Sequence, residues 1–252
     1  MTFHPAAPRA FEAPPKSLDD HVIMITGASD GIGRALAVAC ATLGATVILL
    51  GRDEARLASV YDEIKANGDP QPVIVSLDFL EAEGGAYLSL AERIKEDFGR
   101  LDGLVHCAGI LGEMTEIAEY DAIIWQQVMH VNVTAAFALT KVCLPLLRAS
   151  KGALVFTSSG VGRKGRAFWG AYSVSKFATE GLAQTLADEL DGSGVRVNVV
   201  NPGATRTGMR AKAYPAEDRS ALKTPEQVLP AFLYFLCDTQ DGITGQSVDA
   251  QG

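Results

Sequence analysis

The stretch Val22-Ile-Met-Ile-Thr-Gly-Ala-Ser-Asp-Gly-Ile-Gly33 decides the fold, because it reads as a short apolar strand followed by a glycine-rich turn. The residues after it keep a helical period, with apolar side chains at Ile32, Leu36, Ala39 and Leu43. The glycines therefore lie where a helix begins. Free backbone N–H groups and the positive end of the helix dipole attract an anion there, and the missing side chains let a diphosphate approach the main chain. The pattern predicts a dinucleotide site, with a plain tight turn as the alternative.

Strand-like and helix-like segments alternate along the rest of the chain. Further strands are expected at residues 46–50, 73–77, 104–107, 153–157, 195–200 and near 247–249. Helices are expected at residues 55–67, at 85–98 with Leu88, Ile94 and Phe98 inward, and at 121–147 as one helix with Pro145 at a kink or in its last turn. With 252 residues, 48 % of them hydrophobic, the chain can bury one large core. The fold class is α/β: a single doubly wound parallel sheet of about seven strands with helices on both faces.

Tyr172 and Lys176 stand four residues apart in a stretch that reads as helix, so both side chains project from one face into the same pocket. An ammonium held near a phenol favours the phenolate and pulls its pKa down from a reference value of about 10. Such a pair can run acid–base chemistry at neutral pH. The same spacing also occurs on solvated helix faces, so the pair indicates a catalytic site only when other reactive groups lie nearby.

These motifs together resemble the short-chain dehydrogenase/reductase family. The resemblance rests on the T-G-x-x-x-G-x-G turn at residues 26–33, Ala108-Gly109, Asn132, Ser159, Tyr172-x-x-x-Lys176 and Asn201-Pro202-Gly203, and it covers about residues 18–250. Within the family, the strings at residues 26–33, 49–52 and 169–172 look most like the YciK-like oxidoreductases. The resemblance implies a Rossmann-type fold and hydride transfer between a nicotinamide cofactor and a carbonyl or alcohol.

The resemblance implies a role for each catalytic candidate. Ser159 would polarise the substrate carbonyl, and Tyr172 would donate or take the proton. Lys176 would lower the pKa of Tyr172 and hold the ribose hydroxyls, while Asn132 would fix a water that links Lys176 to solvent. A purely structural alternative exists for two of them, since Ser159 could merely end a strand and Asn132 could satisfy a helix backbone.

The resemblance also predicts a cofactor site along the carboxyl ends of the strands. The expected contacts are Gly27, Ser29, Asp30, Gly31, Ile32, Gly33, Arg52, Asp78, Ala108, Gly109, Tyr172, Lys176, Pro202, Gly203 and Thr207. Two alternatives stay open: the loop at 202–207 could be a mere turn, and Asp78 could be a solvated loop carboxylate.

Arg52, at the end of the second strand, indicates the cofactor type. An acidic residue there would accept the 2′-hydroxyl of NAD, whereas a guanidinium pairs with a 2′-phosphate. NADP(H) is therefore favoured over NAD(H). Asp30 and Asp53 speak against this choice, because relatives that bind NADP often carry a basic residue at the position of Asp30. Arg34 could add phosphate affinity or be ordinary helix surface.

Several further segments could shape the substrate site. Cys107 stands where relatives usually have Asn, and we expect it to behave as a small buried apolar group. The basic run at residues 163–166 could attract an acidic substrate or be a solvated loop. Trp169 and Phe168 could line an apolar wall, an interface or the core. Residues 207–224 resemble the family's mobile lid.

Composition excludes other classes of function. The net charge of −8 and sequence pI of about 5.0 argue against nucleic-acid binding, which needs clustered Lys and Arg. The cysteines at 40, 107, 143 and 237 show no zinc spacing and read as reduced thiols, so no metal is expected. No export signal or membrane span is indicated, and we expect a cytoplasmic protein. Residues 1–16 are expected to be a flexible leader or an arm on the surface, ahead of one domain at 17–252.

The leading hypothesis is an NADP(H)-dependent oxidoreductase of a small ketone or aldehyde, or of the corresponding secondary alcohol. A 3-oxoacyl-carrier reductase is the nearest alternative, and a non-catalytic NADP-binding sensor or scaffold is an alternative of another class. By analogy with relatives, a homodimer or homotetramer is expected.

Overall fold

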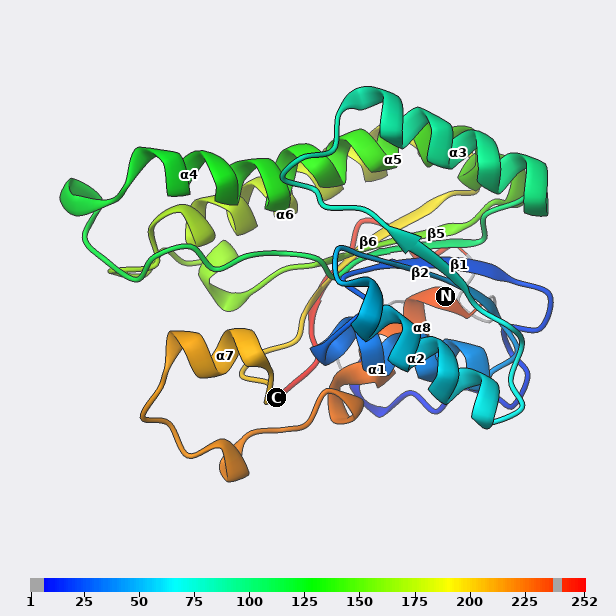
Figure 1. Cartoon of the computed structure of the whole chain (residues 1–252), viewed down its shortest axis with the longest axis horizontal. Helices are drawn as coiled ribbons and strands as arrows, with labels where there is room; N and C mark the ends of the chain where they lie inside the picture. Colours follow the sequence, from blue (N-terminus) through cyan, green and yellow to red (C-terminus); the bar gives the residue numbers. More distant parts are fainter. Residues whose placement is uncertain (1–6, 238–241) are drawn as a thin grey trace.

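A seven-stranded parallel sheet between two layers of helices forms the protein in the computed structural model, which describes residues 7–237 and 242–252 (Figure 1). The strand order is β3-β2-β1-β4-β5-β6-β7. The strands are β1 (Val22–Thr26), β2 (Thr46–Gly51), β3 (Val73–Ser76), β4 (Gly103–His106), β5 (Ala153–Thr157), β6 (Arg196–Asn201) and β7 (Ser247–Asp249). The predicted doubly wound sheet is confirmed, with strand ends within about one residue of expectation.

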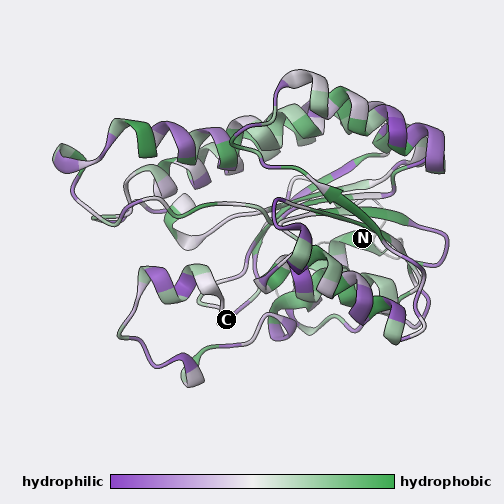
Figure 2. Ribbon diagram, in the orientation of Figure 1, coloured by the Kyte–Doolittle hydropathy of each residue, from purple (hydrophilic) through white to green (hydrophobic). Residues whose placement is uncertain are grey.

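The helices cover both faces of the sheet. One face carries α3 (Gly84–Phe98), α5 (Ala135–Ser150) and α6 (Gly170–Glu189), and the other carries α1 (Gly31–Thr42), α2 (Glu54–Ala66) and α8 (Leu229–Leu236). The apolar stripes of these helices turn toward the strands, while their polar residues face outward (Figure 2). Each face therefore has its own buried core, with Leu36, Leu57 and Phe232 on one side and Leu90, Leu139 and Leu186 on the other.

The direction of winding reverses between β1 and β4, which are neighbours in the sheet but not in the chain. Thr26 at the end of β1 pairs with His106 at the end of β4. The Thr26 hydroxyl also accepts hydrogen bonds from the backbone N–H groups of Cys107 and Ala108, each at 3.1 Å. Ligands of open α/β sheets bind at such a switch point, outside the carboxyl ends of the strands.

The helix expected at residues 121–147 differs from the prediction in one respect. It consists of α4 (Ala122–Met129), a π-helical turn η3 (His130–Thr134) and α5, which contains Pro145 and ends at Ser150. The whole span, Ala122–Ser150, is apolar and long enough by composition to cross a membrane, contrary to the sequence expectation. Half of its most apolar window is buried, however, and α5 packs against the sheet and α3 as a core helix.

Two further expectations are refined. Leu88 of α3 was expected inward but is 56 % exposed, because the buried face of the helix runs through Tyr87, Leu90 and Ile94. Of the proposed leader, residues 1–6 lie outside the described residues. Residues 7–16 lie along the surface of α8, where the ring of Phe11 packs edge-on against Tyr234 at 5.4 Å.

Candidate active site

The glycine turn between β1 and α1 leaves no room for side chains. Gly27 has φ +68°, and a Cβ there would lie 2.9 Å from the Cα of Ala108. A Cβ on Gly33 would collide with the carbonyl oxygen of Gly27, while Ile32 packs against the core. The backbone of β1, the turn and β4 thus approach one another as closely as backbones can.

The remaining residues of the turn lie at the start of α1. Asp30 caps the helix, because its Oδ1 accepts the N–H of Gly31 at 2.7 Å. Ser29 faces β2, where a Cβ on Gly51 would lie 3.7 Å from its Oγ. The space at Gly27 and Gly33 that a Cβ would fill and the N-terminus of α1 together form a cradle, which fits the diphosphate of a dinucleotide.

The loop after β6 folds over this turn. A Cβ on Gly31 would lie 3.2 Å from the methyl group of Thr207, which caps α7 (Gly208–Ala213). The loop itself is held from inside, since Gln251 donates to the carbonyl of Pro202 at 2.7 Å and Gly203 donates to the side chain of Asn201 at 3.1 Å. The structure therefore brings Pro202, Gly203 and Thr207 to the edge where the glycine turn lies.

Gly109, just after β4, joins this edge to the catalytic candidates. A Cβ on Gly109 would lie 3.3 Å from Oδ1 of Asn132 and 3.9 Å from Nζ of Lys176. Ala108, its neighbour, contacts Gly27 on the other side. A dinucleotide on the glycine turn would consequently extend past Gly109 to reach Lys176.

Ser159, Tyr172 and Lys176 meet at the carboxyl end of β5. Ser159 begins the short turn η4 (Gly160–Gly162), whereas Tyr172 and Lys176 lie on the first turns of α6. Tyr172 is 8 % exposed, and the Ser159 hydroxyl is close enough to act on its pKa. The Lys176 ammonium lies 5.6 Å from the centre of the Tyr172 ring and donates to the backbone carbonyl of Thr157 at 2.7 Å.

Burial determines the protonation of this group. It raises the pKa of Tyr172 to about 12, although the Ser159 hydroxyl acts in the opposite direction. It also lowers the pKa of Lys176 to about 8, against the opposing charges of Cys107 and Glu180. The expected lowering of the Tyr172 pKa by Lys176 is not seen in this structure, where desolvation of the phenol is the largest cause of the shift.

Asn132 lies in the π-turn and is buried. Its amide donates to the carbonyl of Ile110 at 3.0 Å and to the hydroxyl of Ser175 at 3.0 Å, and its Oδ1 accepts the N–H of Ile110 at 2.8 Å. The side chain thus ties the loop after β4 to the catalytic helix α6. The extra residue of a π-turn widens the helix locally, and such turns are frequent at functional sites.

Arg52 and Asp78 lie together at the ends of β2 and β3. Their nearest charged atoms are 4.0 Å apart, and Asp78 also caps its own loop by accepting the N–H of Leu80 at 2.9 Å. One helical turn beyond Arg52, Arg56 lies 3.7 Å from Asp30 and 3.3 Å from Asp53. Two guanidinium groups therefore border this edge of the glycine turn.

Tyr172 belongs to an apolar cluster. The cluster consists of Leu111, Val161, Trp169 and Tyr172, with Met114, Met209, Ala213 and Tyr214 packed against them. The expected lid supplies Met209 and Tyr214, and Arg210 clamps this segment through two hydrogen bonds to Glu217. Trp169 belongs to the wall, whereas Phe168 is 53 % exposed.

The structure refines two sequence expectations for nearby residues. In the run at 163–166, Arg163 pairs with Asp249 and Glu180, whereas Lys164 and Arg166 are exposed, and Arg166 donates to the Tyr214 hydroxyl. Cys107 is partly buried as expected, but its sulfur is not purely apolar, since it accepts a hydrogen bond from Thr157 at 3.4 Å. Among the described residues, no group of three or more His, Cys, Asp or Glu side chains could hold a metal ion.

Comparison with known proteins agrees with this geometry. The sequence model of the short chain dehydrogenase family matches residues 21–218. The chain belongs to the short-chain dehydrogenase family. It is 50 % identical to the uncharacterized oxidoreductase YciK of Escherichia coli K12, over 93 % of each chain. This relationship makes the chain an oxidoreductase and confirms the predicted family.

Solved structures of other short-chain dehydrogenases superpose closely on this one. A protein from Shigella flexneri 2a, solved in complex with NADP, is 49 % identical with a TM-score of 0.93, over 95 % of this chain and 100 % of its own. A protein from Escherichia coli CFT073, solved with NADPH, is 50 % identical with a TM-score of 0.92, over the same shares.

Three contributors to this dehydrogenase site were missed by the sequence analysis. Thr157 acts through its backbone carbonyl, which accepts a hydrogen bond from Lys176, and Ser175 acts through its hydroxyl, which accepts one from the Asn132 amide. Neither contact leaves a pattern in the sequence. Arg56 could have been found, because it follows Arg52 by four residues in a segment that reads as helix.

Proposed function

We propose that this dehydrogenase reduces a ketone or aldehyde with NADPH and that Tyr172 is the proton donor. The proposal rests on one observation: Ser159, Tyr172 and Lys176 meet beside Gly109, at the end of the dinucleotide cradle. A bound nicotinamide would supply the hydride. A pure binding module has no need of a buried, positioned proton donor, which argues against the sensor or scaffold alternative.

The protonation of Tyr172 favours the reductive direction. With a pKa raised to about 12, its hydroxyl is neutral over the whole physiological range and can give its proton to the developing alkoxide. Ser159 donates a second hydrogen bond to the same oxygen and stabilises the charge that develops there. Oxidation would need the phenolate, which is scarce near neutrality.

Lys176 and Asn132 support this proton transfer. Lys176, with a pKa lowered to about 8, is mostly an ammonium at neutral pH and can hold ribose hydroxyls or return a proton to the tyrosinate. Asn132 keeps the loop after β4 fixed to α6, and a water ordered by its side chain would connect Lys176 to solvent.

The cofactor is proposed to be NADP(H) rather than NAD(H). Arg52 and Arg56 border the region expected for the adenosine ribose, and both are paired with carboxylates only at distances of 3.3 to 4.0 Å. A 2′-phosphate would be a stronger partner for either guanidinium. The two relatives solved with NADP or NADPH support this choice.

The substrate is proposed to be a neutral carbonyl compound with an apolar body. Trp169, Met209 and Tyr214 present rings and a thioether to the space above Tyr172. The ion pairs of Arg163 leave Lys164 and Arg166 as the exposed cations of the basic run, which weakens the support for an acidic substrate such as an acyl carrier.

Assembly and location are also proposed. The outer faces of α5 and α6 expose Phe137, Val174 and Phe177, each between 42 % and 50 % exposed, which suits a homodimer or homotetramer that buries these helices. Cys40, Cys107, Cys143 and Cys237 form no disulfide among the described residues, which suits a reducing, cytoplasmic setting.

The test compares native protein with Tyr172→Phe on a panel of neutral ketones and aldehydes, following oxidation of NADPH. The variant should bind NADPH like the native protein and lose about a hundredfold or more of the turnover. Tyr87→Phe is the matched control, because it removes a buried α3 hydroxyl that has no hydrogen-bond partner among the described residues and is not one of the catalytic candidates, and it should keep full activity. The contrary outcome is that native protein oxidises NADPH no faster than Tyr172→Phe with any carbonyl of the panel, while both proteins bind NADPH. The protein is then a non-catalytic binding module and not an enzyme.

A further inference from the structure

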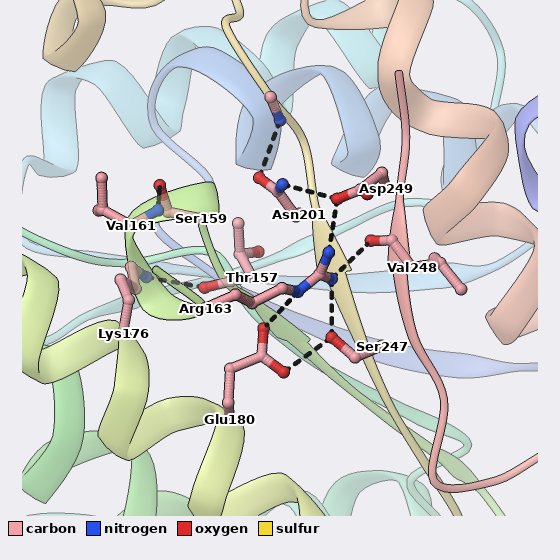
Figure 3. A network of polar contacts seen from close by, with 11 residues as sticks. Thr157, Ser159, Val161, Arg163, Lys176, Glu180, Asn201, Ser247, Val248 and Asp249 are labelled. Carbon is pink, nitrogen blue, oxygen red and sulfur yellow. Dashed lines mark hydrogen bonds and ion pairs between the residues drawn. The ribbon is translucent and has the colours of Figure 1, made fainter. Parts of the chain in front are cut away.

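One carboxylate oxygen joins the two loops that flank the candidate reaction centre. Oδ1 of Asp249, on β7, accepts a hydrogen bond from Arg163 at 2.6 Å and another from the side-chain amide of Asn201 at 2.7 Å (Figure 3). Arg163 follows the turn that begins with Ser159, whereas Asn201 precedes Pro202 and Gly203. The carbonyl-binding side and the cofactor-binding side of the site therefore share one anchor.

Both residues that are hydrogen-bonded to Asp249, Asn201 and Arg163, are linked in turn to a candidate site residue. On one side, Asn201 Oδ1 accepts the N–H of Gly203 at 3.1 Å. On the other, Arg163 closes the η4 turn, whose first residue is capped by Ser159. A shift of Asp249 would consequently move both loops, and small misplacements of reacting groups cost rate steeply.

The same network reaches the catalytic helix. Glu180 lies one helical turn after Lys176, is buried, and contacts Arg163 Nε at 3.3 Å and the Ser247 hydroxyl at 2.7 Å. Arg163 Nη2 donates to that same hydroxyl at 2.7 Å. In Figure 3 the guanidinium lies between the helix and β7 and is bonded to both. Arg163 is thus held by two carboxylates and a hydroxyl, more partners than a solvated loop arginine needs.

We propose that Asp249 is a positioning residue for the reaction, and that Arg163 and Glu180 carry its restraint to the helix that bears Tyr172 and Lys176. The proposal rests on the function proposed above, since it concerns how the proton-donating group and the cofactor loop are held relative to each other. The C-terminal strand then sets the geometry of a site to which it contributes no reacting atom.

Two variants of Asp249 test the positioning role. Asp249→Ala should lower kcat by about tenfold to a hundredfold and weaken NADPH binding severalfold, because both loops lose their anchor. Asp249→Asn keeps an oxygen acceptor at the same place and should recover most of both losses. NADPH affinity is measured by the fluorescence of the bound cofactor, so one readout is independent of turnover.

The charges of the network provide a second readout. Lys176 is faced by Tyr172 and Glu180 of its own helix and by His106 and Cys107 from the end of β4, and of these Cys107 and the Glu180 carboxylate both act to raise the pKa of Lys176. Glu180→Gln should therefore move the alkaline limb of the pH–rate profile to lower pH. Arg163→Met leaves Glu180 uncompensated and should move the limb to higher pH.

Arg100→Met is the matched control. It removes an arginine that is paired with Asp102 at 2.7 Å, just before β4 and so at the amino ends of the strands, opposite the candidate site. Opposite pH shifts, together with rescue by Asp249→Asn, are the expected result. If Asp249→Ala and Arg163→Met change kcat and NADPH affinity no more than Arg100→Met does, or if both charge variants shift the limb in the same direction, the positioning role is wrong. Activity of the native protein on the panel tests the proposed function separately.

Discussion

Acidification should destabilise this protein through one buried histidine beside the cofactor cradle. His106 is 5 % exposed, its Nε2 lies 2.9 Å from the Thr140 hydroxyl, and its ring stacks on Phe156 with centroids 4.9 Å apart. Burial lowers its pKa from 6.5 to about 3, and the Lys176 charge acts in the same direction. The folded state therefore excludes a proton that the unfolded chain binds below its pKa.

The sign and size of the effect follow from this difference. Below pH 6.5 the unfolded state holds more protons on His106, so the free energy of unfolding falls as the pH falls, down to the folded pKa of about 3. The loss is about 1.4 kcal/mol per pH unit, which gives about 2 kcal/mol at about pH 5. The free energy of unfolding of a folded domain is about 5–15 kcal/mol, so a loss of about 2 kcal/mol is large enough to measure.

The substitution His106→Asn removes the titrating ring. Urea unfolding of native and variant protein, measured at several values from about pH 8 to about pH 5, gives the free energy of each. The variant pays a packing cost that is the same at every pH, and its stability should fall less on acidification, by about 2 kcal/mol at the lowest pH. Lys176, with a folded-state pKa of about 8, titrates only at the upper end of this window, and both proteins carry it, so its contribution cancels in the comparison. If the free energies of unfolding of the two proteins fall in parallel as the pH is lowered, His106 is not held neutral in the folded state.

Three further outcomes are expected. Arg52→Ala should weaken NADPH binding about tenfold or more while changing NADH binding little, as measured by cofactor fluorescence; equal losses would remove the argument for a 2′-phosphate site. Gly33→Ala should lower the melting temperature and abolish binding of both cofactors, because its Cβ collides with the Gly27 carbonyl; retained affinity would show that the cradle is not the cofactor site. Trp169→Ala should raise KM for bulky neutral ketones far more than for acetaldehyde, and equal changes in KM would mean that the apolar wall does not contact substrate.

Much of the fold was readable from sequence because its signals are local. The apolar strands, the glycine turn at 26–33 and the Tyr172/Lys176 spacing each follow from a few neighbouring residues. Family resemblance added Asn132 and Ser159, which no local pattern would have singled out. The structure brings these predicted residues to one edge of the sheet.

Features that depend on tertiary contacts could not be predicted. The π-turn at Asn132 inserts one residue into a helix whose apolar period continues on both sides. The ion pairs of Arg163, within the basic run at 163–166, could not be predicted, since its carboxylate partners Glu180 and Asp249 lie far away in the sequence. The raised pKa of Tyr172 depends on how completely the fold buries the phenol, whereas sequence shows only the nearby lysine.

The central claim is that a neutral Tyr172 gives its proton to the substrate oxygen. Its most direct test is the single-turnover rate of NADPH oxidation with a ketone or aldehyde that the native protein reduces, measured across pH for native protein and for cofactor-loaded Tyr172→Phe. The native rate should be constant through neutral pH and fall only as Lys176 deprotonates, with a midpoint near 8, and the variant should stay near background throughout. A native rate that rises with pH through neutrality, or a variant that keeps pace with it, would contradict the claim.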